Sequence, residues 1–239
     1  MSAHHAAAAG SGFAGLGPVP LVLAMAALSL LPFALLMVTC FVRVSVVLSI
    51  LRSAIGAPQL PPTQVLTGLA LVVTLAVMAP TGERMFAAVA PVMGGVPGGV
   101  SNLDLSNDQT VEALGRAADR AKEPLRDFLV AHTAPRDRAT FLALARKMRP
   151  EAERAAVGDR DLAVVVPAFV TSELRRAFEI GFLLFLPFLV IDMVVANLLL
   201  ALGMQMLSPT TVSLPFKLLL FVVADGWALV VRGLMESYL

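Results

Sequence analysis

The sequence predicts an all-α protein: hydrophobic helical hairpins, embedded in a membrane or a larger assembly, with one small charged helical module. Of the 239 residues, 58% are hydrophobic and the mean hydropathy is +0.83, whereas an ordinary soluble domain is about 45–50% apolar. Long apolar runs alternate with breaks rich in proline and glycine, and most of the charge lies in the middle of the chain. We therefore expect four parts: a disordered tail at 1–20, a hydrophobic hairpin at 21–80, a charged module at 81–162 and a second hydrophobic hairpin at 163–239.

The amino-terminal tail is rich in alanine and glycine and carries His4 and His5. A secretory signal peptide begins with Lys or Arg before its apolar core. No positive charge precedes the first apolar run here, so we expect no cleaved signal peptide.

The first hairpin begins with an apolar run at 21–51. As one helix this run would be about 46 Å long, against about 30 Å for the hydrocarbon core of a bilayer, so we expect a kink at Pro32. A connector with three prolines follows. The next run, 65–79, is closed by Pro80 and is shorter than the roughly 20 residues of a full span. These lengths favour a hairpin held within a protein assembly.

Two arginines lie at the far end of the first run, Arg43 and Arg52. Long basic side chains can extend along apolar surface to a headgroup region. The alternative is that they meet acidic groups of a neighbouring protein. The sequence favours neither.

The charged module holds 24 of the chain's 35 charged residues. A glycine-rich segment at 94–99 predicts a flexible linker, and 106–109 resembles a capping box that starts a helix. Pro124 is expected to begin a second helix, and 136–148 has the apolar spacing of a third. Such a module has few large apolar residues and a small hydrophobic core, so we expect it to pack against neighbouring copies of the chain. His132 is expected on its surface.

The second hairpin has apolar runs at 177–202 and 212–231, separated by a break at 203–209. Asp192 lies in the first run and Lys217 in the second, although a charge in an apolar segment costs about 3 kcal/mol. Both are nearly equidistant from position 204–205. They can therefore face each other across the hairpin, or each can pair with an adjacent copy. We expect the pair to set register; an intrachain pair without an assembly role is the alternative.

Local ion pairs, Glu173 with Arg176 and Arg175 with Glu179, are predicted where this hairpin begins, because these residues are three and four apart. Pro167 is expected to open the helix and Pro187 to break it. Three phenylalanines share one face of this helix, and they serve helix packing or, alternatively, line a conduit: Phe178, Phe182 and Phe185.

The stretches SELRRAFEIGFLLFLPFLVIDMVVANLLLALGM, LSPTTVSLPFKLLLF and DGW, together with 41–80, closely resemble the FliP/SctR (YscR, HrcR) family. The two blocks cover about half of the chain. Members of this family are export-gate proteins of bacterial type III secretion, flagellar or injectisome. Flagellar members commonly have a signal peptide and injectisome members do not, so the absence of that pattern favours the injectisome branch, SctR.

The resemblance implies a gated conduit for unfolded polypeptides in the bacterial inner membrane, largely at the periplasmic side of the secretion base. It implies five copies that assemble with the SctS/FliQ-like and SctT/FliR-like gate proteins and contact larger export-gate and inner-rod components. It places the charged module and both termini on the periplasmic side. It assigns subunit contacts to Glu173, Asp192 and Lys217.

The resemblance also implies a pore gasket at the break of the second hairpin. Methionine is flexible and apolar, so a ring of such side chains can close around variable shapes. The family has an unbroken methionine run here, whereas this chain has a polar amide in the middle. The gasket residues are Met204, Gln205, Met206 and Leu207.

The residue inventory argues against an enzyme. The sequence has no glycine-rich phosphate loop, no Cys/His cluster for a metal and no His in an apolar segment, and its net charge of +1 indicates no nucleic acid. Cys40 is a single cysteine, expected to be a packed small hydrophobe. We expect no cofactor. The alternative function is a small-solute or ion channel, or a secondary transporter, that uses Asp192 and Lys217.

Overall fold

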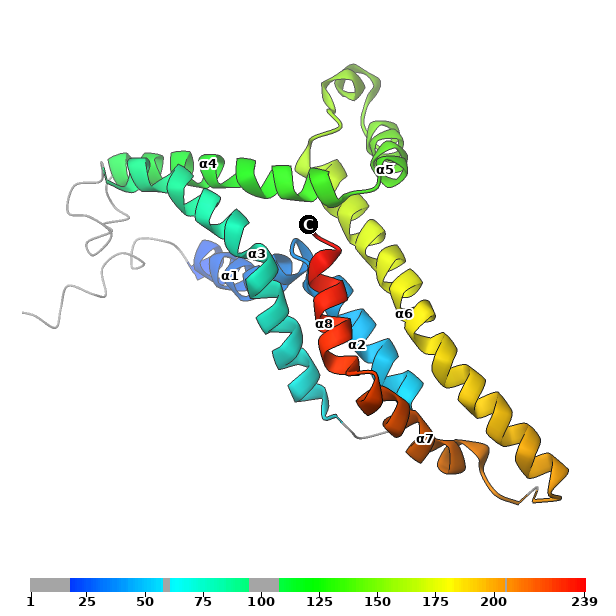
Figure 1. The fold of residues 1–239 in the computed structure, drawn as a ribbon. Helices are drawn as coiled ribbons and strands as arrows, with labels where there is room; N and C mark the ends of the chain where they lie inside the picture. The colour runs from blue at the N-terminus through cyan, green and yellow to red at the C-terminus, as the bar shows by residue number, and fades with distance from the viewer. Residues whose placement is uncertain (1–17, 58–60, 95–107, 205) are drawn as a thin grey trace, which may run out of the picture. The chain divides into compact units, whose positions relative to one another are not determined.

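The structure is a computed structural model that describes residues 18–57, 61–94, 108–204 and 206–239. Every regular element in these ranges is a helix, which confirms the all-α fold class (Figure 1). Most of the predicted tail and of the glycine-rich linker, the start of the predicted capping box and Gln205 lie outside the described residues. The helices are α1 (Pro18–Met37), α2 (Phe41–Ile55), α3 (Thr63–Met93), α4 (Asp108–His132), α5 (Pro135–Lys147), the short 3₁₀ helix η2 (Glu151–Ala156), α6 (Leu162–Ala201), α7 (Pro209–Val223) and α8 (Gly226–Glu236).

The chain divides into two compact units. The first comprises Met1–Leu36 and Ala79–Ala131, and so contains α1, the second half of α3 and nearly all of α4. Two ion pairs on α4 join residues three positions apart: Lys122 Nζ lies 2.8 Å from Asp119 Oδ1, and Arg126 pairs with Glu123. Such pairs stabilise a solvated helix by a few tenths of a kcal/mol.

The second unit comprises Met37–Met78 and His132–Leu239, and it carries every predicted site residue. Within it α2 packs along α6, α5 contacts α6, and α7 contacts the end of α6 that leads into it (Figure 1). One hydrophobic cluster joins α2, the first half of α3, α6, α7 and α8. The contribution of α2 follows helical spacing, as expected for a helix with one buried face: Val44, Val47, Leu48, Leu51 and Ile55.

The close contact between α2 and α6 depends on Gly181. A Cβ atom at this position would lie 2.4 Å from Cδ1 of Ile50 in α2. Because a real side chain cannot sit that close, the absence of a side chain at Gly181 lets the two helices approach. The exact approach of α2 to α6 therefore depends on one residue near the middle of the long helix.

The predicted breaks at proline are wrong. Helix α3 continues through Pro80, α4 through Pro124, and α6 begins at Leu162 and continues through Pro167 and Pro187. Helix α1 also runs through Pro32, and the expected kink there stays a prediction. A proline costs one backbone hydrogen bond, and neighbouring helices and side chains can compensate for that loss in apolar helices. The first apolar run breaks instead at residues 38–40, where the Thr39 hydroxyl accepts a hydrogen bond of 3.4 Å from the Phe41 amide.

Two helices of the described ranges are long and apolar enough to cross a membrane: Thr63–Val92 of α3, and α6. The pair α7 and α8, bent by 60° at its break, makes a third if it counts as one span. The expectation that the second apolar run is too short for a span is therefore wrong, because the helix does not stop at Pro80. Helix α6 has 40 residues, about 60 Å, which is twice the hydrocarbon thickness.

Candidate functional site

A buried polar cluster joins α2, α6 and the carboxy terminus, and we call it the base network: Arg43, Glu173, Ser237 and Tyr238. The side chains of Arg43 and Glu173 are 1% and 0% exposed and form an ion pair. The Tyr238 hydroxyl donates to the other carboxylate oxygen of Glu173, and Arg43 donates to the Ser237 hydroxyl at 2.9 Å. Both oxygens of the buried carboxylate are thus occupied by groups of the same chain.

The Arg43 guanidinium is held by more than hydrogen bonds. Its Cζ atom lies 3.9 Å from the centroid of the Tyr238 ring, a cation–π arrangement. Its Nε has no hydrogen-bond partner within the described residues. Arg43 was expected to reach either a headgroup region or an acidic group of a neighbouring protein. In the structure Glu173 of its own chain supplies the counter-charge instead. Arg52, the other arginine, donates to Thr63 at 2.8 Å.

Two ionisable groups beside the Arg43–Glu173 pair are kept neutral. Burial, and next the Glu173 charge and hydrogen bond, raise the pKa of Tyr238. Burial raises the pKa of the Cys40 thiol to about 11, although its contact with Thr74 acts in the opposite direction. A phenol that stays protonated can keep donating its hydrogen bond to Glu173.

The turn of α6 that carries Glu173 also anchors α5, through a contact we call the α5 seat: Ala134, Asp137, Ser172 and Arg175. The Ser172 hydroxyl donates to Asp137 Oδ2 at 2.7 Å and accepts from the Ala134 amide at 3.0 Å. Arg175 pairs with the other carboxylate oxygen. The predicted ion pairs within α6 are therefore wrong, because Glu173 pairs with Arg43 and Arg175 pairs with Asp137. An exposed ion pair within one helix contributes only a few tenths of a kcal/mol, so these contacts with other helices replace it.

A second charge cluster lies nearer the turn between α6 and α7, and we call it the tip network: Asp192, Ser213 and Lys217. Lys217 Nζ lies 2.6 Å from Asp192 Oδ2 and donates to the Ala54 carbonyl of α2 at 3.0 Å. Ser213 donates to the other oxygen of Asp192 at 2.5 Å. The lysine and aspartate side chains are 4% and 26% exposed. Of the two predicted pairings, the structure has the one across the hairpin, within one chain.

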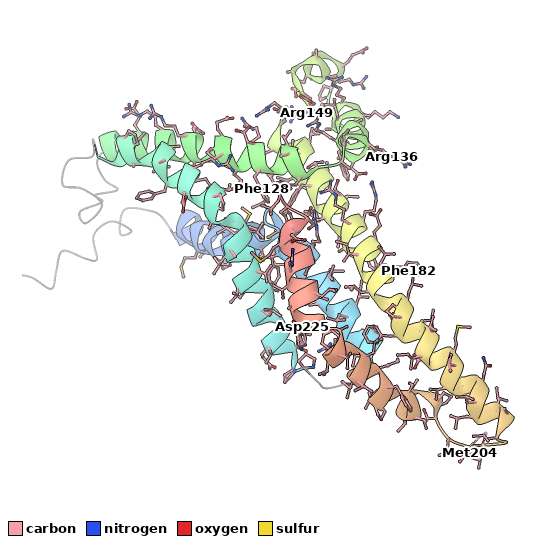
Figure 2. All side chains as sticks on the ribbon, in the orientation of Figure 1. Phe128, Arg136, Arg149, Phe182, Met204 and Asp225 are labelled. Carbon is pink, nitrogen blue, oxygen red and sulfur yellow. The ribbon has the colours of Figure 1, made fainter. Side chains whose placement is uncertain are left out.

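The turn between α6 and α7 carries the predicted gasket residues. Helix α6 ends at Ala201, and Gly203 takes the left-handed backbone conformation (φ +72°) that reverses the chain. Met206 is fully exposed, and Met204 and Leu207 are nearly half exposed. Figure 2 places Met204 in this turn, beyond the end of α6. Gln205 lies outside the described residues.

The three phenylalanines of α6 separate into two environments. Phe185 packs against the hydrophobic cluster, whereas Phe178 and Phe182 are 62% and 61% exposed, and Phe182 points away from α2 in Figure 2. Phe178 and Phe185 border a groove of about 300 Å³ whose other wall is α2. Helix packing within the chain therefore accounts for Phe185 alone.

Comparison with known proteins places these features in a family. The FliP family model matches residues 24–234. The chain belongs to the FliP family. It is 43% identical over 218 residues to the hypersensitivity response secretion protein HrcR of Ralstonia nicotianae, covering 91% of this chain and 96% of the relative. It is 46% identical over 211 residues to the pathogenicity-related ORF2 of Xanthomonas campestris pv. glycines, covering 88% and 92% of the two chains. The flagellar biosynthetic protein FliP of Bacillus subtilis is 42% identical over 221 residues, 92% of this chain and 91% of that one.

FliP-family membership agrees with the resemblance seen in the sequence, and the matched region contains the charged module and most of both hydrophobic hairpins. It does not cover Tyr238, which sequence reasoning also missed as a functional residue. A signal was present: Tyr238 is the only tyrosine in the chain, and Arg43 lies in an apolar run with no acidic residue before Glu83 to neutralise it locally. Among the described residues there is no group of three or more His, Cys, Asp or Glu side chains that could hold a metal ion.

Proposed function

We propose that this chain is a core subunit of a type III secretion export gate. Copies of it, five by family resemblance, assemble with the SctS/FliQ-like and SctT/FliR-like membrane proteins into a gated conduit for unfolded polypeptides. The observation that carries the proposal is the match to the FliP family over residues 24–234, which includes the whole hairpin of α6 and α7. The relatives' names, secretion protein and flagellar biosynthetic protein, support a part in export.

The location of the conduit is the bacterial inner membrane, largely at its periplasmic side. Exposed apolar side chains along α6 and α7 support an environment of lipid or partner helices, since contiguous apolar surface of this extent is unusual on a soluble monomer. They include Phe178, Phe182, Leu183, Val190 and Met193 on α6 and Phe216, Leu219, Val222 and Val223 on α7. The length of α6 supports a subunit that reaches beyond the bilayer.

The turn between α6 and α7 is proposed as the gasket. Thioether side chains adapt to different shapes without losing apolar contact. Met206 and Met204 are available for contacts with other copies because the subunit leaves Met206 fully exposed and Met204 nearly half exposed. In the closed gate, Met204, Met206 and Leu207 from several copies meet and exclude water and ions, and Gln205, between the two methionines in the sequence, is included in the proposal by its position in the chain alone.

The two charge clusters have different parts in this proposal. Glu173 is fully buried by its own chain, so its role is to join helices within the subunit. Asp192 is a quarter exposed, so the tip network holds the register of α6 against α7 and also offers a carboxylate edge to an adjacent copy. A buried pair is weak support for stability, and fixing register is its better-attested use.

The injectisome branch stays a prediction, because relatives of both kinds lie at 41–46% identity. Complementation tests it. The chain is expected to restore export in a strain that lacks its injectisome family member and not in one that lacks its flagellar member. Restoration of flagellar export alone would place it in the flagellar branch.

The experiment that tests the function is the native mass of the detergent-extracted protein, expressed alone and then with the membrane proteins encoded beside it. The proposal predicts a defined oligomer that gains both small gate proteins. A stable monomer or homodimer that ignores them would contradict the proposal and favour the channel or transporter function, with Asp192 as a candidate ion site.

A further inference from the structure

The corner between α4 and α5, residues 132–135, lies between the α5 seat and the base network. On one side the Ala134 amide and Asp137 are bonded to Ser172 of α6. On the other side the His132 ring lies 5.2 Å, centroid to centroid, from the ring of Tyr238, and its Nε2 lies 3.5 Å from the Tyr238 carbonyl oxygen. One short segment therefore contacts both α6 and the carboxy terminus.

These contacts, together with the backbone that joins Ser172 to Glu173, form a closed circuit. From the corner it leads through Ser172 to the neighbouring Glu173, from Glu173 to the Tyr238 hydroxyl, and from the Tyr238 ring back to His132. Arg43 is held inside the circuit by Glu173 and by the tyrosine ring. In a closed circuit, loosening one contact displaces the others, because every member has two partners.

Asp137 is the least replaceable link on the corner side. Helix α5 begins after Ala134, which has no side chain able to cap the free amides of its first turn. The Ser172 hydroxyl of α6 accepts from the amide of Ala134 itself, and Asp137 accepts the proton of the same hydroxyl, which orients its lone pairs towards that amide. Asp137 is 6% exposed, and its second oxygen is bound by Arg175, so its carboxylate fixes both α6 side chains at once.

We infer that Asp137 is a positioning residue for the base network: it fixes the α4–α5 corner on α6, so that His132 backs the Tyr238 ring and Tyr238 stays bonded to Glu173. The inference does not depend on the export function. It states that a substitution in α5 changes the environment of a residue 101 positions further along the chain, which the simple seating of one helix on another would not do.

The test uses Tyr238 itself, which is the only tyrosine of the chain. The ultraviolet absorbance of tyrosinate, followed against pH on the full-length protein in detergent, therefore reports on this one residue. In the wild-type protein the phenol is expected to ionise only when the protein unfolds. In Asp137→Asn the phenol should ionise while the helix content is still intact, at a pH about one unit below that at which the wild-type phenol ionises. One pH unit corresponds to a tenfold change in the ionisation equilibrium.

Asp159→Asn is the matched control. Asp159 belongs to the same charged segment, is 56% exposed and pairs with Arg138 of α5 at 3.8 Å, outside the circuit. This variant should titrate as the wild type does. An unchanged Tyr238 titration in Asp137→Asn, or an equal shift in Asp159→Asn, would overturn the inference.

Ser172→Ala keeps the test decisive if Asp137→Asn does not fold. It removes the hydroxyl that links Asp137 to the corner and leaves the Arg175 pair in place. The same early ionisation of Tyr238 is expected, and a wild-type titration in this variant counts against the circuit. Because the readout is made on the isolated protein, it is separate from the native-mass test of the export function.

Discussion

The base network and the tip network are both ion pairs between helices of one unit, and they differ in enclosure. In the base network the arginine and glutamate side chains are 1% and 0% exposed, and the remaining carboxylate oxygen is taken by Tyr238. In the tip network the lysine is 4% exposed but the aspartate is 26% exposed. The chain itself fully buries the ion pair of the base network, whereas the aspartate of the tip network stays partly exposed.

The difference teaches which pair is internal and which can take part in assembly. Removing one member of a closed pair leaves an uncompensated buried charge, which costs several kcal/mol. Removing the partly exposed aspartate leaves a lysine that still donates to a backbone acceptor, the Ala54 carbonyl. We therefore assign the base network to the integrity of the subunit and the tip network to the register of the hairpin and its contacts with other copies.

Glu173→Ala should have the largest effect on stability. It leaves the Arg43 charge buried without a counter-charge, and the expected loss is about 3–5 kcal/mol. The measurement is thermal unfolding of the detergent-extracted protein by circular dichroism. An unfolding midpoint equal to that of the wild type would show that the base network is not essential for the folded subunit.

Tyr238→Phe should cost less, because the ring stays over Arg43 and only the hydroxyl is lost. Glu173 then lacks one charge-assisted hydrogen bond, which is worth about 1.5–3 kcal/mol. The same unfolding measurement checks it. A loss as large as that of Glu173→Ala would mean that the phenol, and not the ion pair, dominates the base network.

Asp192→Ala should destabilise the subunit by about 1–2 kcal/mol, between the values for exposed and buried pairs. Lys217 retains the Ala54 carbonyl as an acceptor. The control is Asp225→Asn, in which an exposed aspartate at φ 48° is replaced by a residue that tolerates the left-handed region. If Asp192→Ala destabilised as much as Glu173→Ala, the contrast between the two networks would disappear.

The α5 seat adds a dependence on pH. Burial acts to raise the pKa of Asp137, but hydrogen bonds from Ser172 and Arg175 and the charges of Arg175 and Arg136 lower it below its usual 3.8. A carboxyl with a depressed pKa contributes stability above its unfolded value, and this contribution is lost as the pH falls through the folded value. Stability of the wild type should therefore decline below about pH 4 more steeply than that of Asp137→Asn. Thermal unfolding at a series of pH values measures it, and parallel curves would exclude this contribution.

Replacing Met204 and Met206 with Ala should have the smallest effect on stability, within about 0.5 kcal/mol, because both side chains are exposed in the subunit. The expected change is functional: the resting gate leaks small solutes while its assembly is intact. Uptake of a small dye by cells that carry the variant, against cells with wild-type protein, measures it. Unchanged permeability with an intact complex would remove the gasket role.

The sequence predicted the helical class from its apolar run lengths. The pairing of Asp192 with Lys217 across the hairpin is one of the two pairings that their symmetric placement about the turn allowed. The sequence did not predict the helix ends, since a proline removes one backbone hydrogen bond but α3 and α6 continue through theirs. It also missed the partners of Glu173 and Arg175. These partners, Arg43 and Asp137, lie 130 and 38 residues away, and no periodicity within one helix can indicate which distant group will fold against it.

The most direct test of the account is the native mass of the Asp192→Ala variant, co-expressed with the neighbouring gate proteins and compared with the wild type. The account predicts a folded subunit that fails to form the wild-type complex and does not support export. A complex of wild-type mass with wild-type export would contradict the assignment of the tip network to assembly.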